Sequence, residues 1–213
     1  MHRRRRTALV LSAAIAAAPL LAACGSEAHP GAAAVVGGQR ITVAQLQGRV
    51  DEVRRAQRAA VTEETQYQQA VSRTGTLARD TLHQMVLDRV LDQAARDAGV
   101  SVSPRETQQL RSGLEQQAGG AKALETAWLQ QYGVPPRRLD DNLRLQVEAQ
   151  KLAAKLHTDV SRPEFWKALS TASAALRIDL NPRYGSWDVQ KGGVPARTPW
   201  LRDVSAAATQ QKV

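Results

Sequence analysis

The stretch from Leu77 to Gly99 constrains the fold of this chain most, because apolar residues recur along it at helical spacing. Leu82, Val86 and Val90 lie on one predicted face, and Gly99 is a residue type that commonly follows a helix end. The length and regular spacing predict a buried amphipathic helix. Such a helix needs other elements to cover its apolar face, so the rest of the chain must supply them.

Start and stop signals predict further helices on both sides of this one. Ser103-Pro104-Arg105-Glu106 is a capping box with proline at the first helical position, and Ser161-Arg162-Pro163-Glu164 repeats this capping device at the start of another helix. Thr42 is predicted to cap a helix whose polar stretch 54–69 continues as an exposed arm or frays. The other predicted helices run from Ser103 to Gly119, from Leu124 to Tyr132, from Leu139 to about His157, and from Ser161 to Leu176.

Short extended segments are predicted at the two ends of this helical array. Residues 34–36 and 39–41 flank Gly37-Gly38, which is typical of a tight hairpin turn. Residues 177–180 alternate in polarity like a strand. The sequence therefore predicts a mainly α fold with a small β-hairpin and a C-terminal strand.

The N-terminus has the three parts of a secretory signal. Arg3 to Arg6 form a positive start, a mostly apolar run follows from Thr7, and small residues precede Gly25-Ser26. We therefore predict that residues 1–23 are a signal peptide removed on export. The arginines leave the Sec and Tat routes both open.

Cys24 is the only cysteine of the chain and directly follows Leu21-Ala22-Ala23. This order resembles the bacterial lipobox, in which the cysteine accepts diacylglycerol. Two acyl chains anchor a protein stably, so we predict a lipoprotein on the extracytoplasmic face of the cell membrane, with residues 24–33 as a flexible tether. The alternatives are an ordinary signal peptide with a chance cysteine and a short transmembrane anchor.

The formal net charge of +9 is not by itself an indication of nucleic-acid binding. Four of the basic residues lie in the signal segment, so the rest of the chain carries +5, and aromatic residues make up only 4% of the sequence. One cysteine excludes an internal disulfide, and the spacing of the four histidines does not fit a zinc site. With 43% hydrophobic residues the chain can bury a core. We expect no nucleic-acid partner, no metal and no cofactor.

Several segments together carry a resemblance to a known family. They are the hairpin entry at 34–42, the helix around 86–95, the link at 98–104, the helix entry at 133–139 and the segment 181–188. Their order resembles the N-terminal chaperone domain of SurA and the related PrsA and trigger-factor type chaperones. The resemblance implies one SurA N-terminal-like domain over 34–190, closed by a late strand that returns to the hairpin, and a loose tail at 191–213.

The sequence departs from that family where full SurA and PrsA proteins insert parvulin prolyl isomerase domains. One predicted helix fills the segment between His157 and Arg177, and no isomerase domain fits there. The adjacent acids Asp140 and Asp141 point to different faces of a helix, which is typical of first-turn acids that interact with the helix dipole. We therefore expect that the protein is not an enzyme.

Two functions stay open at this point. One is ATP-independent, chaperone-like binding of unfolded or extended segments of exported proteins in a groove between helices. The other is an accessory envelope lipoprotein that binds one specific partner. The candidate client-binding residues are Met85, Trp128, Tyr132, Phe165 and Trp166. Apolar residues at helical spacing are also typical of a core, so the sequence leaves groove and core unseparated.

Overall fold

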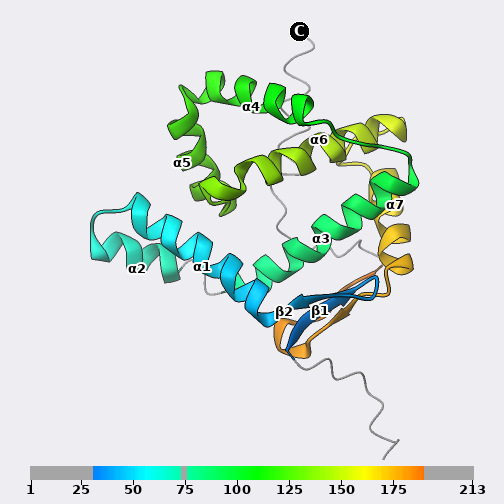
Figure 1. Cartoon of the computed structure of the whole chain (residues 1–213), viewed down its shortest axis with the longest axis horizontal. Helices are drawn as coiled ribbons and strands as arrows, with labels where there is room; N and C mark the ends of the chain where they lie inside the picture. Colours follow the sequence, from blue (N-terminus) through cyan, green and yellow to red (C-terminus); the bar gives the residue numbers. More distant parts are fainter. Residues whose placement is uncertain (1–30, 73–75, 190–213) are drawn as a thin grey trace, which may run out of the picture. The chain divides into compact units, whose positions relative to one another are not determined.

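The computed structural model describes residues 31–72 and 76–189. The predicted signal peptide, Cys24 and most of the predicted tether lie outside these residues, as does the predicted tail at 191–213. The described chain is mainly helical with a small three-stranded antiparallel sheet, which confirms the predicted fold class. Figure 1 shows the helices and the sheet that these residues form.

The sheet joins the two ends of the described chain in the order β2-β1-β3. Strands β1 (Ala32–Val36) and β2 (Gln39–Thr42) form the predicted hairpin, and β1 begins two residues inside the predicted tether. Gly37 and Gly38 have φ angles of 59° and 77°, which a primed turn requires and glycine adopts freely. A side chain at Gly37 would also come within 2.9 Å of Leu176 Cδ2.

Strand β3 (Asp179–Leu180) pairs with β1, as predicted for the late strand. Leu180 lies opposite Ala34, and the Asn181 backbone N–H donates a 3.0 Å hydrogen bond to the Ala33 carbonyl. Ala33 and Leu180 are buried at this seam. The last described strand therefore closes the fold against the first.

Seven α-helices and two short 3₁₀ turns account for most of the other described residues. Their bounds are α1 (Val43–Ala60), α2 (Glu64–Ser72), α3 (Leu77–Asp97), α4 (Pro104–Ala118), α5 (Ala121–Tyr132), η1 (Pro136–Arg138), α6 (Leu139–Lys155), α7 (Pro163–Ala175) and η2 (Pro182–Tyr184).

Two predicted helix caps are confirmed and one is wrong. The hydroxyls of Thr42 and Ser103 accept from the backbone N–H groups of Gln45 and Glu106, and both caps form complete capping boxes. Helix α7 begins one residue later than its capping pattern predicted, with Arg162 at the N-cap. Pro163 forces the preceding residue into an extended conformation, so Arg162 takes the position predicted for Ser161. The Ser161 hydroxyl instead donates to Asp159 Oδ1.

The polar stretch after Arg54 forms two helices where the sequence predicted one continuing or fraying arm. Helix α1 ends before Val61, whose backbone is extended, and α2 has no buried residue. Arg58 bridges the break, because it pairs with Glu64 and its guanidinium lies 4.7 Å from the Tyr67 ring centroid. Such exposed contacts stabilise a helix pair only weakly.

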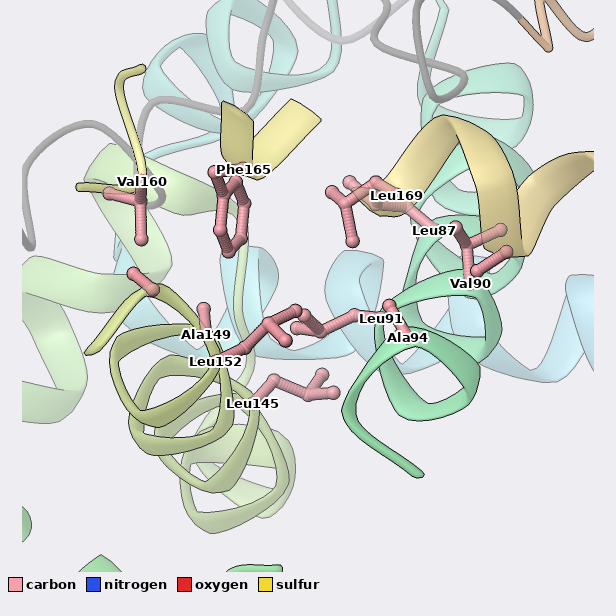
Figure 2. Packing of buried hydrophobic residues seen from close by; sticks show 12 residues of the cluster. Leu87, Val90, Leu91, Ala94, Leu145, Ala149, Leu152, Val160, Phe165 and Leu169 are labelled. Atoms are coloured by element: carbon pink, nitrogen blue, oxygen red, sulfur yellow. The ribbon is translucent and has the colours of Figure 1, made fainter. Parts of the chain in front are cut away.

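Helix α3 lies at the centre of the core and packs against α1, α6, α7 and β1. Its residues Leu87 and Leu91 meet side chains of α6 and α7, and Figure 2 shows the Phe165 ring within this cluster. Toward the sheet, Leu82 and Val86 pack on Ile41 and neighbouring strand residues. The predicted burial of the 77–99 helix is confirmed, and the remaining surface of α3 is left to line a groove with α1 and α6.

Candidate functional site

A groove lies between α1, α3 and the start of α6, and these elements can be followed in Figure 1. It consists of two adjoining cavities of about 200 Å³ and about 500 Å³. We call them the apolar cavity and the polar cavity. The residues that line both cavities are Arg49, Glu52, Met85, Asp88, Arg138, Asp141 and Leu145.

The apolar cavity takes its apolar surface from four parts of the chain. Helix α1 contributes one residue, α3 two, the α5 end with its following link three, and α6 one. These residues are Val53, Leu77, Met85, Tyr132, Val134, Pro135 and Leu145. Met85 is the most adaptable of them, because its unbranched thioether side chain can repack around different shapes.

An ion-pair cluster around Arg138 ties α1 to the start of α6. Arg138 Nε donates to Glu52 Oε2 at 2.9 Å, and its Nη1 donates to Asp141 Oδ2 at 3.0 Å. The hydrogen bond from Arg138 lowers the pKa of Glu52 below its usual value. Because 86 residues separate Glu52 from Arg138, this contact fixes one groove wall against the other.

Asp88 on α3 is the least compensated carboxylate of the groove. Its Oδ1 accepts a 2.7 Å hydrogen bond from Gln84 Nε2, and it forms no ion pair with any residue that the structure describes. Burial raises the pKa of Asp88 to about 7, because a charged carboxylate loses hydration in this environment. Asp88 is therefore a carboxyl group that holds its proton to a higher pH than an exposed aspartate does.

A second ion cluster closes the polar cavity between α3 and α6. Arg144 Nη2 donates to Asp92 Oδ1 at 2.9 Å, and its Nη1 donates to Glu148 Oε2 at 3.2 Å. Burial raises the pKa of Glu148 to about 7, and the neighbouring Asp92 carboxylate adds to this effect. One arginine thus holds two carboxylates, one of which is almost fully buried.

The family model of the SurA-like N-terminal domain matches residues 1–153, a range that contains every residue lining the groove. The chain belongs to the SurA-like N-terminal domain family. No curated protein and no solved structure matches the chain. The match confirms the resemblance found in the sequence, and a SurA-like domain is of the chaperone type and fits binding of polypeptides.

The match ends inside α6, so α7 and β3 of this SurA-like domain lie beyond it. Between α6 and β3 the chain contains α7 as its only regular element. This agrees with the single helix predicted at that place.

Two of the five predicted client-binding residues, Met85 and Tyr132, line the groove of the SurA-like domain. Trp128 lies behind its wall, where its indole N–H donates to Asn142 Oδ1 at 3.2 Å and its ring meets Tyr132 edge to face. Trp128 therefore supports the position of Tyr132 from outside the groove.

Phe165 and Trp166 lie away from the groove, in and beside the core. Phe165 is 0% exposed, so the prediction that it contacts a client is wrong. Neighbouring residues of a helix point about 100° apart, and α7 turns Phe165 inward while Trp166 stays partly exposed beside it. Figure 2 shows the Phe165 ring directed toward the side chains of α3 and α6.

Sequence reasoning missed the charged residues of the groove, above all Asp88. A signal was present, because Gln84, Asp88 and Asp92 recur every four residues and place a polar stripe beside the apolar face of this helix. Asp140 and Asp141 diverge as expected: they accept hydrogen bonds from Arg111 and Arg138 respectively.

Two further findings concern only the part of the chain that the structure describes. Within residues 31–72 and 76–189, no three His, Cys, Asp or Glu side chains are grouped so that they could hold a metal ion. In the same residues no helix combines the length and the apolar character that crossing a membrane requires.

Proposed function

We propose that this SurA-like domain binds unfolded or extended segments of exported proteins in the groove between α1, α3 and α6, without ATP and without prolyl isomerase activity. The observation that carries the proposal is an open groove that offers apolar surface from several elements and polar groups beside it. Non-native chains expose apolar side chains, and the burial of each stabilises a complex without requiring a fixed sequence.

The groove suits varied clients because its apolar surface is adaptable. Met85 lines both cavities and is partly buried against the sheet-side core cluster. Tyr132 gives a large flat contact at the other wall. Holding a segment in this way needs no catalytic group.

The proposal extends to the place where the protein acts. We infer that Cys24 is acylated and holds the domain at the extracytoplasmic face of the cell membrane, where exported chains emerge unfolded. The support is the lipobox-like order of Leu21-Ala22-Ala23-Cys24. Substituting Cys24→Ser is expected to move the protein out of the membrane fraction or leave it unprocessed; unchanged processing and membrane retention would disprove the anchor.

Light scattering of an unfolded test protein, with and without an equimolar amount of the protein, tests the function. We expect suppressed aggregation without ATP. The variant Met85→Gln should suppress less, because it replaces groove apolar surface with an amide. The matched control is Leu156→Gln, since Leu156 is 36% exposed and lies outside the groove.

Equal suppression by the two variants would show that the groove is not the binding surface. No suppression by the unaltered protein would reject general chaperone-like binding. That second result would favour the accessory lipoprotein with one specific partner. Melting curves of both variants confirm that each remains folded.

A further inference from the structure

We propose that the groove prefers segments in which a lysine or arginine lies close to an apolar side chain, and that the Asp88 carboxylate receives the basic group. This inference rests on the proposed function, because it specifies which segments the groove binds. It concerns selectivity among clients and adds no catalytic step.

The charge of the apolar cavity runs opposite to that of the whole chain. Four acidic residues and two arginines line it, although the chain carries a net charge of +9. These residues are Glu52, Asp80, Asp88, Asp141, Arg49 and Arg138. A cationic ligand group is therefore favoured inside the apolar cavity even though acidic ligands are favoured at long range.

The positive charge of Arg138 is already compensated by two carboxylates of the protein. Its guanidinium donates to Glu52 and to Asp141, so it is not available to attract an acidic ligand. Asp88 forms no ion pair with a described residue, although Arg49 and Arg144 attract its charge from a longer distance, and Arg49 forms no ion pair with a described residue either. Asp80 accepts a hydrogen bond from the Thr76 hydroxyl and lies 3.8 Å from Arg79, so the charged groups of the apolar cavity without an ion pair to a described residue are Asp88 and Arg49.

The position of the Asp88 carboxylate fits a cation donated by a ligand. Oδ1 is occupied by Gln84, whereas Oδ2 makes no hydrogen bond with a described residue and is not sealed from solvent. A lysine ammonium or an arginine guanidinium would give this poorly hydrated carboxylate a charge-assisted hydrogen bond. An acidic ligand group would instead repel the Asp88 carboxylate and destabilise its charged form further.

The preference for an apolar side chain in the bound segment comes from the turn of α3 that precedes Asp88. Met85 lies three residues before Asp88 on α3, and Leu145 of α6 lines both cavities with them. A bound segment can therefore bury an apolar side chain against Met85 and Leu145 while its basic side chain meets Asp88. This pairing defines the client chemistry as apolar and basic together.

Fluorescence anisotropy of three labelled ten-residue peptides tests the inference with the full chain in detergent. The peptides share alternating leucine and serine and differ at two positions, which are lysine, glutamate or glutamine. At pH 7.5 the lysine peptide is expected to bind at least five times more tightly than the glutamate peptide. The substitution Asp88→Asn should bring this ratio close to one while the glutamine peptide binds as before.

A matched control lies on the same helix. Asp97 accepts a 2.7 Å hydrogen bond from Gln93, four residues earlier, as Asp88 does from Gln84, but Asp97 is exposed and outside the groove. Asp97→Asn should leave the ratio unchanged. A second variant, Arg49→Gln, should increase the preference for lysine because it removes the competing cation.

Equal or tighter binding of the glutamate peptide would overturn the inference, as would a ratio that Asp88→Asn leaves intact. If the peptides bind without charge preference, the inference fails while the proposed function stands. If none of the three peptides binds, both fail. Melting curves check that every variant is folded.

Discussion

The behaviour of Asp88 shows how position alone changes an ordinary carboxyl group. The polar groups facing it are Gln84 and Asp92 on its own helix, Arg49 on α1 and Arg144 on α6. Of these only Gln84 makes a direct hydrogen bond, so burial outweighs the attraction of the two arginines and raises the pKa from 3.8 to about 7. Above pH 7 the protein therefore holds a carboxylate charge that burial destabilises.

We predict that the substitution Asp88→Asn stabilises the fold above pH 7. The folded state holds a proton that the unfolded state releases near pH 3.8, so the free energy of unfolding falls as pH rises from about 4 to about 7. The asparagine variant does not lose this stability and should have a free energy of unfolding that is larger by roughly 2 to 4 kcal/mol at pH 8. Urea unfolding of both proteins at pH 4 and pH 8 measures the difference.

The two proteins should have nearly equal stability at pH 4, where Asp88 is protonated in both the folded and much of the unfolded population. Glu148 titrates in the same direction, so a smaller decline with pH should remain in the variant. If the variant were less stable than the parent at pH 8, the ionised Asp88 carboxylate would not destabilise the fold.

At the scale of single elements, β3 (Asp179–Leu180) and the turn after it contribute directly to the stability of the fold. Leu180 and Tyr184 are buried, and Trp187 Nε1 donates to Ser173 Oγ at 2.7 Å. Burying two such side chains contributes on the order of 3 to 6 kcal/mol, which is comparable with the whole stability of many domains.

We therefore expect a chain ending at Arg177 to lose its cooperative melting transition. It lacks the β1–β3 pairing, the Asn181 hydrogen bond to Ala33 and the buried side chains of the closing segment. A chain ending at Gly192 keeps all of these and is the control, with a melting temperature close to that of the full chain. A sharp, unshifted transition for the shorter chain would contradict the assigned role of β3.

Local signals predicted most of the elements, because each is encoded within a few residues. The Thr42 cap, the Ser103 capping box and the Gly37-Gly38 turn are of this kind. The start of α7 was wrong by one residue because two local rules competed there, and the proline rule prevailed over the serine cap.

The groove lay beyond sequence reasoning for a different reason. Its walls are joined by contacts between distant residues, such as Glu52 with Arg138 and Asp92 with Arg144, and no short motif encodes them. The sequence predicted Met85, Tyr132 and Phe165 alike as apolar candidates. Only the packing of the helices shows that the first two line the groove and that Phe165 is buried in the core.

At the scale of the whole SurA-like domain, one helix connects stability and binding. Helix α3 gives one face to the core and another to the groove, while ion pairs from Arg138 of η1 and Arg144 of α6 hold the groove walls. The core therefore keeps the groove open without any contribution from a bound segment. An open, preformed site avoids the ordering cost that would weaken binding of an already flexible client.

Site-specific photo-crosslinking to an unfolded test protein tests groove binding most directly. A photoreactive amino acid is placed at Thr81, which lines the apolar cavity, or at Thr171, an exposed residue of α7 outside both cavities. The account predicts crosslinked product from position 81 and little from position 171. Equal yields from the two positions, or a higher yield from position 171, would contradict binding in the groove.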